Sequence, residues 1–290
     1  MKFDKNTKIL IVGLGLIGGS YAKALSDEGY FVGAIDKKKS SVEYALKNGL
    51  IQVGETSVKK DFVKDFDLIV FALYPHDFIN WIKEYQSSIK SGALITDVTG
   101  VKSFVVENVQ KILRGDLEFV GAAPMAGKEV SGVENADPKI FVGANYIVTP
   151  TKRNTDENVQ AVKDLGRALG FERISSLSPE EHDETVGFLS HLTHCIAVSL
   201  MVSKKSHHLA EYTGDSFRDL TRIAKINDEM WSELFLANKD ELLKQMDLFE
   251  EKFNKLKEDI KNDNREKIRE TLRESTARRK VFDKDAKETK

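Results

Sequence analysis

The feature that most constrains this chain is a glycine-spaced turn close to its N-terminus. Residues 13–18 read GLGLIG; they follow an apolar run, Lys8–Val12, that predicts a strand, and they lead into a predicted helix, Ile17–Asp27. In this context the first glycine permits a tight turn, the second lets the backbone approach a pyrophosphate, and the third lets the helix pack against the strand. The start of the helix attracts the anion through its free N–H groups and its dipole. The turn therefore predicts a dinucleotide site formed by Gly13, Gly15, Leu16, Ile17 and Gly18.

An acidic residue ends the second predicted strand. Asp36 follows the apolar run Phe31–Ile35 and lies 18 residues beyond Gly18. A carboxylate at this position can accept hydrogen bonds from the ribose hydroxyls of adenosine and repels a 2′-phosphate, which favours NAD over NADP. Three lysines, residues 37–39, follow at once and leave a phosphate site open as the alternative, although charge runs generally form solvated turns.

Through the first half of the chain, short apolar runs alternate with amphipathic segments. This alternation predicts a parallel sheet covered by helices on both faces. The later predicted strands are Leu68–Leu73, Ala93–Val98, Glu118–Gly121, Ala144–Val148 and Phe171–Ile174, and the later predicted helices are Ser40–Asn48, Phe78–Ile89, Val101–Leu113 and Asp156–Leu169. We therefore expect an α/β domain with a Rossmann-type doubly wound sheet, which binds the dinucleotide and spans residues 1–177.

The character of the sequence changes near Ser178. The segment Thr185–Val202 is apolar nearly all round, which predicts a buried helix. A heptad-like stripe then follows on a long predicted helix. The stripe consists of Leu242, Met246, Phe249, Phe253, Leu256 and Ile260. Such a stripe is buried either in its own domain or against a second subunit, and we expect residues 178–290 to form an all-helical C-terminal domain.

Composition narrows the classes of protein. The 46 acidic and 44 basic residues nearly cancel, giving a net charge of −2, which argues against a protein that mainly binds nucleic acid or an anionic membrane. One cysteine, Cys195, excludes an internal disulfide framework and a cysteine-based zinc site, and favours a reducing compartment. The apolar run near the N-terminus is shorter than the roughly 20 residues that span a bilayer. We expect a cytoplasmic protein with neither a nucleic-acid nor a membrane partner.

Four further segments carry side chains suited to substrate chemistry. They read DVTGVK (97–102), GAAPMAGKE (121–129), SHLTH (190–194) and DLTRIA (219–224). The first follows a predicted strand, at the sheet edge where open α/β sheets bind ligands, and makes Asp97 a further candidate for cofactor binding.

Two histidines and an arginine stand out within these segments. His191 and His194 are three residues apart on one helix face, but further metal ligands are not found nearby, so we expect a lined pocket rather than a metal site. A core histidine remains the alternative for each. Arg222 stands among apolar residues and needs an anion, either a substrate carboxylate bound bidentately or a structural partner such as Asp219 or Glu211.

Taken together, GLGLIGGS, DVTGVK, APMAGKEVSG, SHLTH and FRDLTRIA resemble the prephenate dehydrogenase family, in order and approximate spacing, over residues 8 to about 235. The resemblance implies an enzyme of tyrosine biosynthesis that uses NAD to convert prephenate to 4-hydroxyphenylpyruvate, CO₂ and NADH. It implies a Rossmann domain followed by a helical domain that forms a homodimer. It also implies that Arg222 holds a substrate carboxylate and that His191 and His194 line the substrate pocket, with His194 a candidate for catalysis.

Two positions depart from the family pattern. Ala123 stands where the family usually has a histidine that partners the reacting 4-hydroxyl, and Gly100, beside Thr99, stands where the family often has a serine near the same hydroxyl. A missing general base typically costs about 10²–10⁴ in rate. Either the histidine was replaced by engineering, or Thr99, a water or a pocket histidine takes its role, or turnover is poor. We expect an Ala123→His variant to raise kcat with little change in KM.

The resemblance leaves other functions open. The substrate can be arogenate instead of prephenate. A β-hydroxyacid-type dehydrogenase has a similar build and generally uses a catalytic lysine in its helical part, where this chain offers Lys204, Lys205 and Lys225. A catalytically silent NAD-binding protein is the third alternative.

Overall fold

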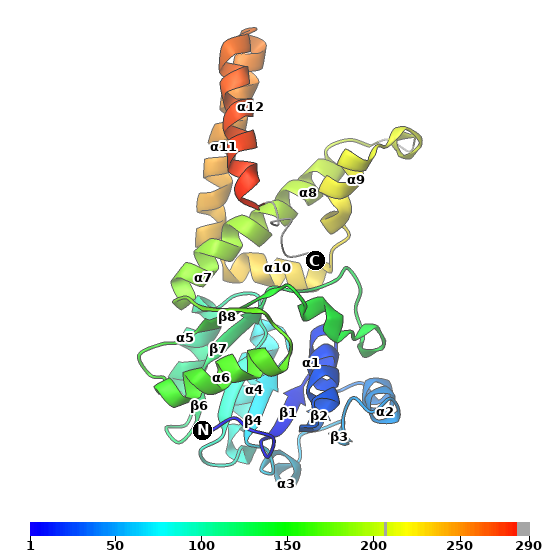
Figure 1. Cartoon of the computed structure of the whole chain (residues 1–290), viewed down its shortest axis with the longest axis vertical. Helices are drawn as coiled ribbons and strands as arrows, with labels where there is room; N and C mark the ends of the chain where they lie inside the picture. The colour runs from blue at the N-terminus through cyan, green and yellow to red at the C-terminus, as the bar shows by residue number, and fades with distance from the viewer. Residues whose placement is uncertain (206–207, 283–290) are drawn as a thin grey trace. The chain divides into compact units, whose positions relative to one another are not determined.

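The computed structural model describes residues 1–205 and 208–282. The chain divides into two compact units, the first spanning Met1–Lys239 and the second beginning at Asp240. Both sheets belong to the first unit, and a pair of long helices makes up the second (Figure 1). The expected boundary between residues 177 and 178 stays a prediction, and residues 283–290 at the end of the expected helical domain lie outside the described residues.

A six-stranded parallel sheet forms the centre of the first unit, with the order β3-β2-β1-β4-β5-β6. Its strands are β1 (Lys8–Val12), β2 (Phe31–Ile35), β3 (Val53–Glu55), β4 (Leu68–Phe71), β5 (Leu94–Asp97) and β6 (Glu118–Phe119). The strand order reverses between β1 and β4, which opens a crevice at the carboxyl ends of the strands, where dinucleotides bind in such sheets. The predicted Rossmann-type doubly wound sheet is confirmed.

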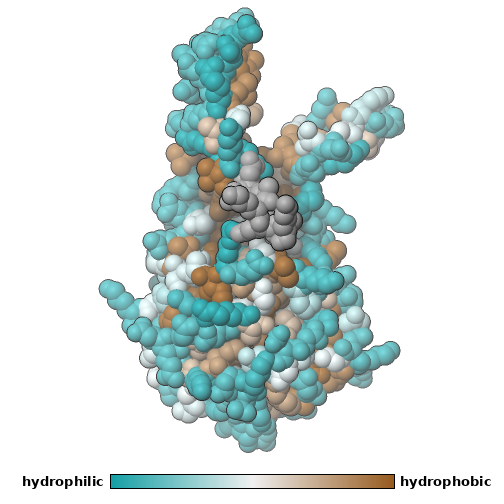
Figure 2. Space-filling model, viewed as in Figure 1, coloured by the Kyte–Doolittle hydropathy of each residue, from teal (hydrophilic) through white to brown (hydrophobic). Residues whose placement is uncertain are grey.

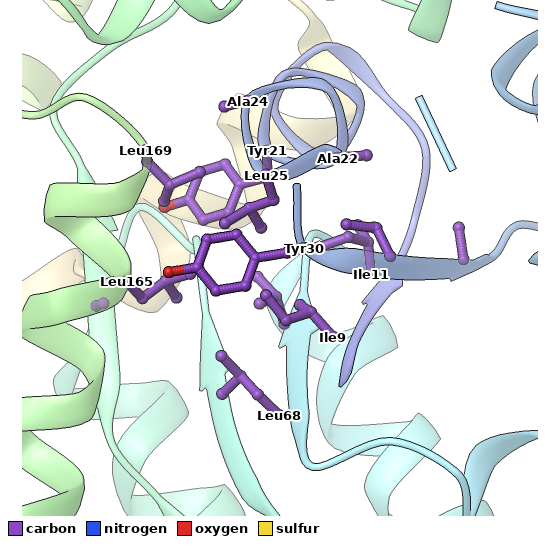
Figure 3. Packing of buried hydrophobic residues seen from close by; sticks show 14 of the residues in the cluster. Ile9, Ile11, Tyr21, Ala22, Ala24, Leu25, Tyr30, Leu68, Leu165 and Leu169 are labelled. Carbon is purple, nitrogen blue, oxygen red and sulfur yellow. The ribbon is translucent and has the colours of Figure 1, made fainter. Parts of the chain in front are cut away.

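Helices cover both faces of this sheet because its strands are apolar on both sides. The helices are α1 (Leu16–Asp27), α2 (Lys39–Lys47), α3 (Lys60–Val63), α4 (Pro75–Tyr85), α5 (Ser103–Ile112) and α6 (Asp156–Ala168). Alternate residues of β1 enter different cores: Ile9 and Ile11 join one cluster, whereas Leu10 joins the other. Figure 3 shows the first cluster, in which the rings of Tyr21 and Tyr30 pack near Ile9 and Ile11.

The last three strands do not join the parallel sheet, which corrects the expectation of one sheet. They are β7 (Gly121–Pro124), β8 (Asn145–Thr149) and β9 (Arg173–Ser176), and they form a separate sheet in which β7 runs antiparallel to β8. The predicted strand Glu118–Gly121 is therefore two strands that divide at Val120. Alternating strands and helices predict that strands exist, but which sheet a strand joins depends on long-range pairing.

The helical part of the first unit follows β9. It consists of α7 (Pro179–Val186), a π-helical turn η4 (Gly187–Leu192), α8 (Thr193–Val202), the short turn η5 (Leu209–Tyr212), α9 (Asp215–Thr221), the short turn η6 (Arg222–Ala224) and α10 (Asp228–Ala237). The expectation that Thr185–Val202 is buried is wrong for the single chain, in which Phe188, Leu189, Met201 and Val202 are exposed. Apolar composition predicts burial, but it does not say whether the same chain supplies the cover.

Length and composition alone would allow the helical run Pro179–Val202 to cross a membrane. Core helices of water-soluble proteins pass the same test, so this is weak support for a membrane segment. The run also carries three buried polar side chains, His182, Asp183 and His191. Ionisable groups of this kind are costly inside a bilayer.

The second unit contains α11 (Lys239–Lys261) and α12 (Arg265–Arg279). The predicted stripe lies on α11, which confirms a single long helix there. Several stripe residues are exposed in the single chain, namely Met246, Phe249, Phe253 and Ile260. Figure 2 shows the brown, hydrophobic side chains that run along this helix pair.

Candidate functional site

The glycine turn, residues 13–18, joins β1 to α1 and owes its shape to backbone contacts. Gly13 has a φ of +99°, a backbone angle that residues other than glycine rarely adopt. A Cβ on Gly13 would lie 2.4 Å from the carbonyl oxygen of Ala72, and a Cβ on Gly18 would lie 2.0 Å from that of Gly13. At Gly15, by contrast, a Cβ would meet no atom of the described residues within 4 Å. Two glycines are thus required by packing, while the third leaves free space above the turn.

This space fits the pyrophosphate of a dinucleotide. Helix α1 begins at Leu16, and Gly15 at its N-cap offers no side chain to the first N–H groups. Beside the turn, Asp36 Oδ2 accepts a hydrogen bond from Leu14 N at 2.7 Å, and Oδ1 accepts one from Lys38 N at 2.7 Å. The carboxylate is therefore held at the end of β2, where the predicted contact with ribose hydroxyls requires it.

Asp97, at the end of β5, is buried and bonded within the protein. Its Oδ2 accepts hydrogen bonds from Lys102 Nζ at 2.6 Å and Thr99 N at 3.0 Å, and its Oδ1 accepts one from Ala122 N at 3.1 Å. Burial lowers the pKa of the Lys102 ammonium, against the opposing effect of Asp97. Asp97 thus holds the loop of residues 97–102 in shape, and its predicted contact with the cofactor stays a prediction.

Of the two positions expected to depart from the family pattern, Gly100 lies within this loop and Ala123 lies beside it. The hydrogen bond from Ala122 N to Asp97 brings its neighbour Ala123, which is buried in β7, next to the loop. A Cβ on Gly100 would lie 3.3 Å from the methyl groups of Leu234, so this leucine of α10 covers the glycine. Thr99 Oγ1 lies within hydrogen-bond distance of Asp97 and of Val101 O, and accepts a hydrogen bond from Lys102 Nζ at 3.1 Å.

Helix α7 binds the end of the same loop through the carboxylate of Asp183, a residue to which the sequence analysis gave no role. Asp183 accepts hydrogen bonds from the backbone N–H groups of Lys102 at 2.7 Å and Ser103 at 2.8 Å, and from His182 Nδ1 at 2.8 Å. Burial alone would raise the pKa of Asp183, but these hydrogen bonds outweigh it and lower the pKa. The adjacent His-Asp pair in the sequence was the available signal, although nothing local pointed to its partners.

His191 and His194 converge on one indole ring. His194 stacks on Trp231 of α10 with 3.7 Å between ring centroids, and His191 meets the same ring edge-on at 6.0 Å. His191 Nδ1 lies 3.2 Å from Asn238 Nδ2, and His194 Nδ1 lies 2.8 Å from Ser190 O. Burial lowers the pKa of both rings, that of His191 to about 4.

Arg222 is placed differently from the expectation. Its side chain is exposed instead of surrounded by apolar residues, and its ion-pair partner is Glu129 rather than Asp219 or Glu211. Glu129 belongs to the loop that follows β7 and Ala123, and η6, which begins at Arg222, packs against α8. The structure therefore brings Arg222 between the loop after Ala123 and the helix that carries His194.

Helix α10 connects these parts of the site. Besides Trp231 and Leu234, it carries Glu233, which accepts a hydrogen bond from His76 N at 2.6 Å in the first turn of α4. Helix α10 thus reaches the histidines, the loop 97–102 and the carboxyl edge of the sheet. Among the described residues, no three His, Cys, Asp or Glu side chains are grouped so as to hold a metal ion.

Comparison with known proteins gives consistent matches in sequence and structure. The family model described as prephenate dehydrogenase, nucleotide-binding domain, matches residues 21–173, and the model described as prephenate dehydrogenase, dimerization domain, matches residues 178–274. A prephenate dehydrogenase of Bacillus subtilis is 32% identical over 270 residues, which cover 90% of this chain and 72% of the relative. A cyclohexadienyl dehydrogenase of Zymomonas mobilis is 29% identical over 96% of both chains.

Among solved structures, the prephenate dehydrogenase of Aquifex aeolicus in complex with hydroxyphenyl propionate and NAD⁺ superposes with a TM-score of 0.87. It is 34% identical, and the match covers 96% of this chain and 98% of that one. Its bound NAD⁺ agrees with the cofactor predicted from the glycine turn and Asp36. The resemblance inferred from the motifs is therefore confirmed: this chain belongs to the prephenate dehydrogenase family and has its nucleotide-binding Rossmann-type domain and its helical dimerisation domain.

Proposed function

We propose that this chain is an NAD-dependent dehydrogenase that oxidatively decarboxylates prephenate to 4-hydroxyphenylpyruvate in cytoplasmic tyrosine biosynthesis. The observation that carries the proposal is that α10 packs against His191 and His194 and against the loop 97–102 at the carboxyl edge of the sheet. Arg222, on a turn that packs against α8, pairs with the loop after Ala123. A guanidinium for a carboxylate, aromatic walls for a ring and a hydride acceptor at the sheet edge are what this reaction requires.

The residues of the glycine turn fit NAD. Its pyrophosphate would lie over Gly15, against the N–H groups of Leu16 and Ile17, and its adenosine ribose would meet Asp36. When bound, NAD supplies the acceptor for the hydride. The fixed carboxylate of Asp36 supports NAD over NADP because a 2′-phosphate would be repelled there.

Arg222 is proposed to hold a carboxylate of the substrate. Its guanidinium forms an ion pair with the carboxylate of Glu129. A carboxylate of the substrate can take the place of Glu129 in this pair. Ring C4 then loses a hydride to NAD⁺ while the ring carboxylate departs as CO₂. The electrons of the broken C–C bond complete the aromatic ring, and the 4-hydroxyl becomes the phenol of the product.

The helical part is proposed to form a homodimer through residues 178–290, with the domain boundary at residue 177. Support comes from the apolar side chains that α8 and α11 expose in the single chain, including Met201, Val202, Phe249 and Phe253. A face of this kind is normally covered by a partner. The helical run Pro179–Val202 contains Asp183, whose buried carboxylate accepts hydrogen bonds from the backbone at the start of α5. We therefore assign this run to the helical domain and not to a membrane.

A steady-state assay that follows NADH absorbance tests the proposed function. We expect turnover with prephenate and NAD, and less than about a tenth of that rate with NADP, because the Asp36 carboxylate repels a 2′-phosphate; a tenfold ratio corresponds to about 1.4 kcal/mol. Arogenate and a panel of β-hydroxy acids serve as alternative substrates. Activity confined to arogenate would reassign the substrate, and activity confined to hydroxy acids, or tight NAD binding without turnover, would overturn the proposal.

A further inference from the structure

His191 and His194 each present Nδ1 to a partner whose hydrogen-bond polarity is fixed. A neutral imidazole has one nitrogen that donates and one that accepts, and the partner of one nitrogen decides which tautomer is present. The two partners here differ in polarity. One is a side-chain amide, and the other is a backbone carbonyl.

Asn238 determines the tautomer of His191. Its Nδ2 lies 2.9 Å from the carbonyl oxygen of Asp183, which can only accept, so the amide must turn its NH₂ group to this side. The second hydrogen of the same NH₂ group then points to His191 Nδ1 at 3.2 Å. His191 Nδ1 is therefore an acceptor, its proton is on Nε2, and the ring has no free lone pair with which to take another proton.

Ser190 determines the opposite tautomer for His194. The backbone oxygen of Ser190 can only accept, so His194 Nδ1 must carry a hydrogen and donate it over 2.8 Å. His194 Nε2 then keeps its lone pair and is the basic atom of the ring. The ring stacks on Trp231 and lies on α8, against which the turn of Arg222 packs.

We propose that His194 Nε2 is the proton acceptor for the substrate 4-hydroxyl in this chain, in place of the histidine that the family has at position 123, and that Asn238 is a positioning residue that keeps His191 a donor. The proposal rests on the proposed function. The hydroxyl proton moves to Nε2 as C4 gives up its hydride and the C4–O bond gains double-bond character. It returns to oxygen as loss of CO₂ completes the phenol, so the reaction releases no net proton.

Thr99 and His191, two other candidates for this role, are already hydrogen-bonded within the protein. Thr99 Oγ1 is bonded among Asp97, Val101 and Lys102, and Gly100 lies under Leu234. The titratable groups that act on the His191 ring are Asp183, His182 and His194, and the lone pair of that ring, on Nδ1, already accepts the hydrogen bond from Asn238.

The tautomers are tested first, without reference to activity. Long-range ¹H–¹⁵N correlation spectra of protein labelled at its six histidines, assigned with single His variants, should show His194 protonated on Nδ1 and His191 on Nε2. His182, which donates from Nδ1 to Asp183, provides an internal reference for the Nδ1–H pattern. Asn238→Asp should shift only the His191 signals, because its carboxylate accepts from Nδ1. Identical tautomers at 191 and 194, or a basic Nδ1 at 194, would overturn the proposal.

Kinetics test the role of the basic atom. His194→Asn keeps a donor near the Nδ1 position and removes Nε2, so we expect kcat to fall roughly 10²–10⁴-fold with little change in KM. The matched control is His208→Asn: this exposed side chain faces Glu211, and its replacement should leave kcat unchanged. Ala123→His should raise kcat at least about tenfold more in the His194→Asn background than in the parent, because the two imidazoles serve one step.

The pH profile separates a base from a structural residue. The base must be neutral to act, and burial lowers the pKa of His194 below its ordinary value of 6.5, so kcat should fall only at pH values below that range. This acid limb should disappear in His194→Asn. Unchanged kcat in His194→Asn, or an equal gain from Ala123→His in both backgrounds, would overturn the proposal. If the parent oxidises neither prephenate nor arogenate, the proposed function fails together with the role of His194, whereas the spectra still decide the tautomers.

Discussion

The glycine turn of residues 13–18 and the pocket wall hold their shapes by different means. We use the term pocket wall for the loop 97–102, α7, α8 and α10 together. In the turn, backbone atoms meet backbone atoms, and a single methyl group at Gly18 would lie 2.0 Å from a carbonyl oxygen. In the pocket wall, buried side chains make the contacts: Asp97 pairs with the Lys102 ammonium, and Asp183 of α7 accepts a hydrogen bond from the backbone N–H of Lys102.

This difference separates what each region tolerates. A site made from backbone accepts changes in side chains that point away from it, whereas a site made from side chains can exchange its polar groups while keeping its frame. We expect such an exchange around the loop 97–102, where the resemblance implies that Ala123 and Gly100 replace polar groups of the family while Arg222 and the histidines are kept. The comparison predicts that substitutions in the two regions will fail in different ways.

The largest effect is expected in the pocket wall, from Lys102→Met. The variant leaves the Asp97 carboxylate buried without its cation, which typically costs about 3–5 kcal/mol of unfolding free energy. Chemical denaturation measures the loss, and the double variant with Asp97→Asn should recover part of it. Lys64→Met, an exposed lysine, serves as the control and should leave the midpoint unchanged. A fully stable Lys102→Met protein would remove the distinction drawn between the two regions.

Arg222→Gln should affect catalysis and not folding. Losing a charge-assisted contact to the substrate carboxylate costs about 2–3 kcal/mol, or roughly 30- to 150-fold in kcat/KM. Arg218→Gln is the matched control, since this exposed arginine pairs with Asp215 within its own helix. Equal losses for the two arginines would show that general charge, and not the position of Arg222, attracts the substrate.

Gly18→Ala should destabilise the fold through the turn. The added methyl group overlaps the carbonyl of Gly13, and overpacking of this kind costs about 1–3 kcal/mol. The denaturation midpoint without cofactor measures the effect. If the variant unfolds like the parent, backbone packing does not set the shape of the turn.

Gly15→Ala should have the smallest effect on stability and should act on the cofactor. No atom of the described residues meets the new methyl group, so unfolding should change by less than about 1 kcal/mol. Because the methyl group occupies the space proposed for the pyrophosphate, NAD should bind roughly tenfold more weakly, which is about 1.4 kcal/mol. Calorimetric titration with NAD checks this result, and unchanged affinity would place the pyrophosphate elsewhere.

The sequence by itself predicted the features that depend on local backbone needs. Strand β1 and strand β2 have the bounds that their apolar runs indicate, and Gly13 has the positive φ that the turn requires. Such features can be predicted because a strand pattern or an obligatory glycine depends on residues that are neighbours in the sequence. The short elements β3 and α3 escaped detection because three or four residues carry too little pattern.

Only the tertiary structure decided which distant groups meet. The separate sheet of β7–β9, the pairing of Arg222 with Glu129 and the grip of Asp183 on the start of α5 join segments far apart in the chain. The tautomers inferred for His191 and His194 depend on Asn238 and on the carbonyl of Ser190. Hydrogen bonds form between groups about 3 Å apart in space, whatever their separation in the sequence. These contacts can therefore be identified only in the folded chain.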